Sequence, residues 1–179
     1  MSKLGKKPIS IPKDTNVKIE SGKLTLSGPK GSKQLSINEK IFSASLSEDN
    51  QLILKVIKKN EISNRMWGTT RSLINSAVIG VATGFEKILE LTGVGFRAIL
   101  KGDVITFQLG FSHDTQFKIP ADVKVAIEKN TIIKITGTDK QLVGKVASDI
   151  KTLKPIEPYK GKGIKERGQY VLRKEGKKK

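Results

Sequence analysis

The chain has 179 residues, enough for one large domain or two small ones, and 36% of them are hydrophobic, so a core can form. Its 34 Lys and Arg outnumber 17 Asp and Glu, and the net charge of +17 favours a polyanionic partner such as nucleic acid. The lack of cysteine excludes disulfides, thiolate metal sites and cysteine nucleophiles, and no apolar run suits a signal sequence or a membrane span.

The positive charge is concentrated at the two ends of the chain. Residues 1–13 contain four Lys and no acid, and residues 151–179 contain 11 basic and three acidic residues, a net of +8. By subtraction from +17, the 137 residues between these ends carry only +5. We therefore expect a cytoplasmic protein whose ends face a polyanion and whose middle is an ordinary folded body without a membrane partner.

The first predicted strands form a pattern that returns later in the chain. The segment ISIPKDTNVKIESGKLTLSGPKG, from Ile9, resembles FKIPADVKVAIEKNTIIKITGTDK, from Phe117. Both place alternating apolar residues on either side of a turn, which predicts two strands with one buried face each. The aligned positions are Ile11-Pro12 with Ile119-Pro120, Asp14 with Asp122, Val17 with Val125, Ile19 with Ile127, Glu20 with Glu128, Leu24 with Ile133, Leu26 with Ile135, and Gly28 with Gly137.

This similarity predicts a duplicated domain, because solenoid repeats are shorter and because a helix pattern follows each copy. Chance likeness between two β-rich stretches is the alternative. In the first copy, residues 35–46 and 52–57 complete the strands, and the run Gly28-Pro29-Lys30-Gly31 predicts a solvated β-turn, although its Lys could contact phosphate. The helix is predicted along SNRMWGTTRSLINSAVIGV, where the apolar spacing is carried by Met66, Thr70, Leu73, Ile74 and Ala77.

The second copy is predicted from three strands, at residues 86–91, 94–100 and 104–111, with Lys101-Gly102-Asp103 as a hairpin turn. Its helix carries Leu142, Val146 and Ile150 at helical spacing and is stopped by Pro155. The predicted fold class is therefore α+β, with two similar domains that each pack an antiparallel sheet against one helix, neither needing a strand from elsewhere. The predicted segments are a domain over 1–82, a domain over 83–153 and a basic extension over 154–179.

Two motifs resemble catalytic or cofactor sites only superficially. Ser112-His113-Asp114 contains the residues of a hydrolase triad, but sequence neighbours cannot place the imidazole between hydroxyl and carboxylate. Gly93-Val94-Gly95-Phe96-Arg97-Ala98 fits a permissive dinucleotide fingerprint, yet a strand pattern follows it where a helix is required. We therefore expect no enzymatic activity, no cofactor, no metal and no small-molecule substrate.

The sequence LKPIEPYKGKGIKERGQYVLRKEGKKK, from Leu153, is the candidate RNA-binding segment. Its prolines favour an extended chain, and glycines between lysines let the backbone approach a phosphodiester while the ammonium groups neutralise it. Both tyrosines of the chain lie here and could stack on unpaired bases; a disordered solubilising tail is the alternative. The candidate RNA-binding residues are Lys154, Pro158, Tyr159, Lys160, Gly161, Lys162, Gly163, Lys165, Arg167, Arg173 and Lys174.

Three stretches resemble the bacterial family of the sixth large-subunit ribosomal protein. PIEPYKGKGI is similar to its C-terminal signature, and GTTRSLINSAVIGV and GFEKILELTGVGFRA are similar to two further stretches, in matching order and spacing. The resemblance implies a duplicated α+β fold that binds large-subunit ribosomal RNA through the C-terminal domain and extension, near the base of the factor-recruiting stalk and among other ribosomal proteins. The signature positions in this sequence are Pro158, Tyr159, Lys160, Gly161, Lys162 and Gly163.

The sequence departs from the family pattern in two places. Lys165-Glu166 stands where relatives often have an Arg-Tyr pair, so a stacking or guanidinium contact is not expected there. Ser76-Ala77 stands where the first helix usually has Asn-Met, which changes packing. Two functions of other classes are alternatives: an RNA-modifying enzyme, which would need a pocket with a perturbed acid or base, and a free-standing nucleic-acid chaperone.

Overall fold

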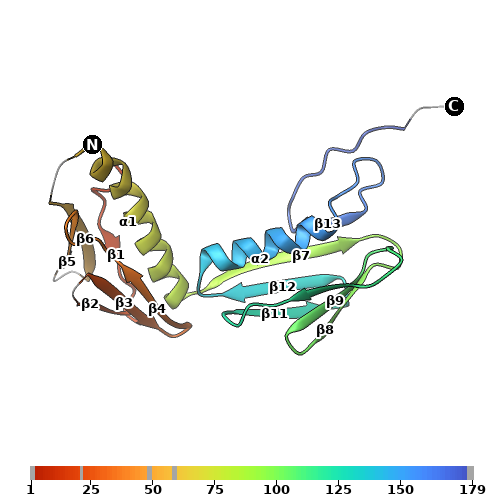
Figure 1. The fold of residues 1–179 in the computed structure, drawn as a ribbon, viewed down its shortest axis with the longest axis horizontal. Coiled ribbons are helices and arrows are strands. Elements are labelled where there is room, and N and C mark those ends of the chain that lie inside the picture. The colour runs from red at the N-terminus through yellow and green to blue at the C-terminus, as the bar shows by residue number, and fades with distance from the viewer. Residues whose placement is uncertain (1–2, 21, 48–49, 58–59, 177–179) are drawn as a thin grey trace. The chain divides into compact units, whose positions relative to one another are not determined.

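The computed structural model describes residues 3–20, 22–47, 50–57 and 60–176, and divides the chain into two compact units, Met1–Gly84 and Phe85–Lys179 (Figure 1). We call them the N-terminal and C-terminal units. Both combine a helix with antiparallel strands, which confirms the predicted α+β class. In the described part of the chain, no helix is both long enough and apolar enough to cross a membrane.

The N-terminal unit contains two three-stranded antiparallel sheets, with strand orders β1-β6-β5 and β2-β3-β4. A helix, α1, packs against them, and one apolar core includes residues of both sheets and the helix. The bounds are β1 (Ile9–Ser10), β2 (Asn16–Glu20), β3 (Lys23–Gly28), β4 (Gly31–Ser36), β5 (Phe42–Leu46), β6 (Gln51–Val56) and α1 (Glu61–Ala82).

Two details of this unit differ from the prediction. The strand expected over 35–46 is divided, because the carbonyl of Asn38 accepts backbone hydrogen bonds from Ile41 and Phe42 and so forms a turn. The expected helix face was partly wrong: Ile74 and Ala77 are buried, but Met66 and Leu73 are 44% and 43% exposed. Apolar residues on both sides of α1 made the buried stripe ambiguous from spacing alone.

The predicted turn at Gly28-Pro29-Lys30-Gly31 is confirmed, since Gly28 pairs with Gly31 across β3 and β4. The backbone N–H of Lys30 donates to the carbonyl of Val81 at 3.0 Å, which ties this turn to the end of α1. A Cβ at Gly28 would lie 2.5 Å from the same carbonyl oxygen, so only glycine fits. The turn thus has a structural role in docking the helix.

The C-terminal unit contains a four-stranded sheet of order β11-β12-β7-β13 and a three-stranded sheet of order β10-β9-β8. The helix α2 lies along β7 and β12, and one core joins it to both sheets (Figure 1). The bounds are β7 (Phe85–Thr92), β8 (Arg97–Lys101), β9 (Val104–Gln108), β10 (Thr115–Lys118), β11 (Val123–Glu128), β12 (Ile132–Gly137), α2 (Lys140–Leu153) and β13 (Gly163–Glu166).

The duplicated segments form the same hairpin in both units. In the first, Val17 pairs with Leu26 and Ile19 pairs with Leu24, and in the second the aligned residues make the aligned pairs. The register of β2 with β3 is therefore repeated in β11 with β12. Such agreement in register supports duplication over chance similarity, because a slip of one residue would exchange the buried and exposed faces.

Ser112-His113-Asp114 lies in a loop, as expected, whereas the strand expected over 94–100 begins only at Arg97, so Gly93–Phe96 form a turn. A strand, β8, follows the Gly93–Phe96 turn, so the helix required by the dinucleotide fingerprint is absent from this described stretch. Strand β9 ends at Gln108, earlier than predicted, and Gly110 adopts a φ of 72°, which turns the chain before the exposed His113. Lys101 pairs with Val104, which confirms the hairpin turn between β8 and β9.

The stretch beginning at residue 154, predicted as an extension, supplies a strand to the C-terminal unit. Residues 163–166 form β13, which pairs antiparallel with β7, and its Ile164 is only 1% exposed. The edge of β7 offers free backbone groups, and Ile164 offers an apolar side chain to the core beneath α2. The sheet is therefore completed by residues far from it in sequence.

Candidate nucleic-acid interface

The candidate interface begins where α2 ends. Asp139 caps the start of this helix by accepting from the backbone N–H of Gln141 at 2.9 Å, and the helix ends at Leu153, two residues before Pro155. Proline disfavours helical geometry in the residue before it and offers no N–H of its own, so the chain leaves the helix. The backbone N–H of Ile164 then donates to the carbonyl of Lys154 at 3.0 Å, which holds the departing chain beside β13.

Residues 157–162 form a closed loop, which we call the basic loop. The N–H of Glu157 donates to the carbonyl of Lys162 at 2.8 Å, and the N–H of Gly161 donates to the carbonyl of Glu157 at 3.1 Å. The N–H of Lys174 donates to the carbonyl of Pro158 at 2.8 Å, so the later chain returns to the loop. These bonds give the predicted Pro-Tyr-Lys-Gly-Lys-Gly signature a defined conformation.

The glycines of the signature are required by the loop itself. Gly161 has a φ of 69° and Gly163 a φ of 140°, conformations that residues with a Cβ rarely adopt. A Cβ at Gly163 would also lie 2.7 Å from the carbonyl oxygen of Pro155. The space beside Gly163 is therefore filled by the chain's own backbone, which gives this glycine a structural reason independent of phosphate.

Four predicted cations gather around the basic loop. Lys160 and Lys162 are exposed on it, and Lys174 is brought to it by the bond to Pro158. The guanidinium of Arg173 packs over the loop, since a Cβ at Gly161 would lie 3.1 Å from one of its Nη atoms. Within residues 3–20, 22–47, 50–57 and 60–176, no carboxylate forms an ion pair with any of these four side chains. Their charge is available to an external anion.

Two other predicted cations are paired within the protein. Lys165 Nζ lies 3.2 Å from one oxygen of Glu90, and Arg167 Nε lies 3.1 Å from the other. Hydrogen bonds from Arg167 and then from Lys165 hold the pKa of the Glu90 carboxyl below its usual range. These two cations thus share one carboxylate, whereas Lys160 and Lys162 are exposed on the basic loop.

A third predicted cation, Lys154, contacts an aromatic ring. Its Nζ lies 4.2 Å from the centroid of the Phe111 ring, at a distance suited to a cation–π interaction. Its side chain is half-buried. Lys154 therefore joins the end of α2 to the loop after β9.

The two tyrosines of this segment present aromatic surface to solvent. Tyr159 is 55% exposed on the basic loop, and Tyr170 is 85% exposed beyond β13. Tyr170 borders a groove of about 550 Å³ between α2 and the last described residues. The groove is lined by Ser148, Lys151, Thr152, Pro155, Ile156, Pro158, Ile164, Gln169, Tyr170, Val171 and Leu172.

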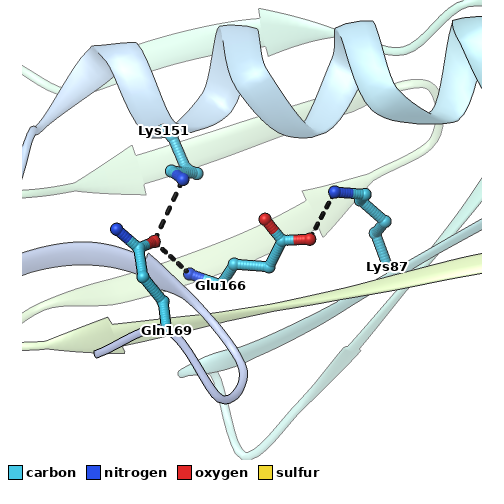
Figure 2. Close-up of polar contacts among 4 residues, drawn as sticks. All are labelled: Lys87, Lys151, Glu166 and Gln169. Carbon is cyan, nitrogen blue, oxygen red and sulfur yellow. Dashed lines mark hydrogen bonds and ion pairs between the residues drawn. The ribbon is translucent and has the colours of Figure 1, made fainter.

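A network of polar contacts that the sequence did not reveal anchors β13 from the side of α2 (Figure 2). Lys87 on β7 forms an ion pair with Glu166, and Lys151 on α2 donates to the side-chain oxygen of Gln169 at 3.0 Å. That oxygen also accepts from the N–H of Glu166 at 3.3 Å. The partners are up to 79 residues apart in sequence, so spacing gave no signal for these contacts.

Comparison with known proteins relates the whole chain to ribosomal proteins. The large ribosomal subunit protein uL6 of Phenylobacterium zucineum is 45% identical over 179 residues, which cover 100% of both chains. The chain belongs to the uL6 family. A uL6 protein from Beijerinckia indica is 43% identical over the full length of both chains, and one from Staphylococcus epidermidis is 41% identical over 99% of this chain and 98% of its own.

The family model described as ribosomal protein L6 matches residues 92–167 of this uL6 family member. That range includes α2, the basic loop and β13. Membership in the uL6 family confirms the resemblance carried by the three sequence stretches. It also identifies the chain as a structural constituent of the large ribosomal subunit, and as no enzyme.

Proposed function

We propose that the chain binds large-subunit ribosomal RNA through the basic loop and the residues that return to it. The observation that supports this is a group of four exposed cations, none with an ion pair in the described part of the chain, around a loop held by its own backbone hydrogen bonds. Phosphate contacts of this kind position a protein on RNA by charge and shape, with few base-specific contacts. The contacting cations are Lys160, Lys162, Arg173 and Lys174.

The remaining predicted site residues take supporting roles in this proposal. Pro158, Gly161 and Gly163 shape the loop, and Tyr159 offers an aromatic face beside its lysines. Lys154, Lys165 and Arg167 hold the surrounding chain in place through Phe111 and Glu90. We further propose that the bound RNA lies near the base of the factor-recruiting stalk, where other ribosomal proteins are neighbours.

The decisive test reverses the charge of the two exposed lysines of the basic loop. Lys160→Glu with Lys162→Glu should weaken binding to large-subunit ribosomal RNA fragments by about tenfold or more, because each lost charged contact is worth on the order of 1.5 kcal/mol. The salt dependence of the binding constant should fall by about one unit for each phosphate contact removed. Fluorescence anisotropy titrations over a range of salt concentrations measure both quantities.

The matched control reverses the charge of two lysines that are exposed elsewhere in the C-terminal unit. Lys118→Glu with Lys124→Glu makes the same change in net charge on β10 and β11. We expect it to reduce affinity much less than the loop variant does. Equal losses in the two variants would show that only total charge matters and would refute the loop as the contact. Cross-linking of Lys160 to RNA in assembled subunits locates the contact and checks the stalk-base position.

A further inference from the structure

The feature that carries this inference is an acidic side chain that holds two cations of the candidate RNA-binding segment. Glu90 lies on β7, opposite Lys165 in the β7–β13 register, and its two oxygens accept separately from Lys165 and Arg167. The backbone N–H of Arg167 also donates to the carbonyl of Ile88 at 2.9 Å. One carboxylate therefore holds a residue within the pairing, Lys165, and the first residue beyond it, Arg167.

The attachment of β13 uses both faces of the strand. Lys165 and Arg167 contact Glu90 on one face. Glu166 is bound by Lys87 on the other face, which packs beneath α2 (Figure 2). The basic loop precedes β13 directly, and the residues that cover the loop follow it. Movement of β13 would therefore change the position of the loop and of Arg173 together.

Two physical effects of Glu90 on RNA binding have opposite signs. As a negative charge near a phosphate-binding segment, Glu90 should oppose the approach of RNA, so its removal should strengthen binding. As the group that orders β13, Glu90 should keep the basic loop in its binding-competent arrangement, so its removal should weaken binding. The contacts of Glu90 with two cations at about 3 Å favour the second effect, because these cations would otherwise repel each other and be free to leave the sheet.

We propose that Glu90 is a positioning residue for RNA binding, which acts by holding Lys165 and Arg167 on β7 so that the basic loop keeps its geometry. This inference rests on the proposed function of the loop. In this arrangement Lys165 and Arg167 do not contact phosphate, and their charge is used to fasten the segment to the sheet. An acidic residue thereby contributes to the binding of a polyanion.

The test compares two single substitutions that remove the same charge from the same strand. Glu90→Gln should weaken binding to a large-subunit ribosomal RNA fragment by about fivefold, because a looser segment occupies the competent arrangement for less of the time. Glu86→Gln is the matched control, since Glu86 is exposed on β7 and is not bonded to β13. It should leave the affinity unchanged or raise it slightly. Affinity for Glu90→Gln equal to or above that of Glu86→Gln would overturn the inference.

A double-mutant cycle separates positioning from general destabilisation. If Glu90 acts only through Lys165 and Arg167, then Glu90→Gln added to Lys165→Gln with Arg167→Gln should cause no further loss of affinity. The salt dependence should stay near that of the unchanged chain in all these variants, because no phosphate contact is removed. A loss from Glu90→Gln that simply adds to the loss from the other two substitutions would contradict the positioning role.

The variant Lys160→Glu with Lys162→Glu, measured in the same experiment, distinguishes failure of the inference about Glu90 from failure of the proposed function. If this loop variant loses affinity and Glu90→Gln does not, only the inference about Glu90 is wrong. If the loop variant binds as tightly as the unchanged chain, the proposed function is wrong and the role of Glu90 falls with it. Amide exchange at Arg167 in the free protein reports directly whether β13 has loosened, and unchanged exchange in Glu90→Gln would also overturn the inference.

Discussion

At the scale of single residues, the repeat has placed a glycine at the same position in both units, for the same geometric reason. Gly28 ends β3 against α1, and Gly137 ends β12 against α2. A Cβ at Gly28 would lie 2.5 Å from the carbonyl oxygen of Val81, whereas one at Gly137 would lie 2.8 Å from a methyl group of Val143. The close approach of strand end and helix therefore excludes a side chain in both units, but against different kinds of atom.

This difference predicts unequal effects of adding one methyl group. Gly28→Ala should lower the free energy of unfolding of the N-terminal unit by about 2–3 kcal/mol, because helical backbone cannot move aside. Gly137→Ala should cost the C-terminal unit about 1 kcal/mol, because a valine methyl can turn away. Urea titrations followed by fluorescence distinguish the units. The single Trp, at position 67, lies in the N-terminal unit, and both Tyr, at positions 159 and 170, lie in the C-terminal unit. A smaller loss for Gly28→Ala would contradict this account.

The residue scale is also where sequence reasoning was least complete. The cations around the basic loop were predicted from composition and spacing, because exposed lysines need no partner to be recognised. Glu90 and Lys87 were not predicted, because their roles depend on pairing with residues that follow them by more than 70 positions. Lys165 and Arg167 were assigned to phosphate for the same reason: their sequence shows their charge but not the carboxylate that already holds them.

At the scale of elements, β13 combines two properties that the sequence had suggested to be separate. It belongs to a strongly basic segment, yet Ile164 packs into the core and the strand pairs with β7 over four residues. The predicted hairpins and helices were recognisable from local periodicity, and most were confirmed. A four-residue strand after a loop of prolines and glycines has too short a pattern to be recognised, and only the open edge of β7 gives it a partner.

Deletion of the segment should therefore affect folding as well as binding. Removal of residues 154–179 should lower the stability of the C-terminal unit by about 2–4 kcal/mol, because Ile164 and the β7–β13 hydrogen bonds are lost. Removal of residues 171–179 keeps β13 and Gln169 and should change stability by less than about 1 kcal/mol, while the loss of Arg173 and Lys174 still weakens RNA binding. Urea titrations followed by far-ultraviolet circular dichroism compare the two deletions; equal stability would argue against β13 as a core strand.

The attachment of β13 should also depend on pH. Hydrogen bonds from Arg167 and Lys165 lower the pKa of the Glu90 carboxyl from its ordinary value of 4.5. A carboxyl with a lower pKa in the folded state stabilises that state above the unfolded pKa, and this stabilisation is lost as the pH falls through the folded value. We therefore expect the Arg167 amide to lose protection from exchange as the pH falls below about 4.5. Glu90→Gln should remove this pH dependence. If the exchange of the Arg167 amide varied with pH in the same way in Glu90→Gln and in the native chain, the prediction would be wrong.

At the scale of the whole molecule, the excess positive charge is concentrated towards one end of the chain. The chain carries a net charge of +17, and the four exposed cations around the basic loop lie together in its last 20 residues. The two units have their own cores, and the aligned segments of the repeat pair in the same register in both. Family membership was predictable because three motifs with fixed order span much of the chain. The geometry of the basic loop was not predictable from the sequence, because it depends on hydrogen bonds between β13, the end of α2 and the last described residues.

The pairing of β7 with β13 has a consequence for folding during synthesis of the chain. During translation β7 leaves the ribosome first among the described elements of its unit, and β13 leaves it after all the others. Domains fold as their residues emerge. The open edge of β7 therefore lacks this partner until residues 163–166 have also been synthesised, so the basic loop can become ordered only after the rest of its unit is present.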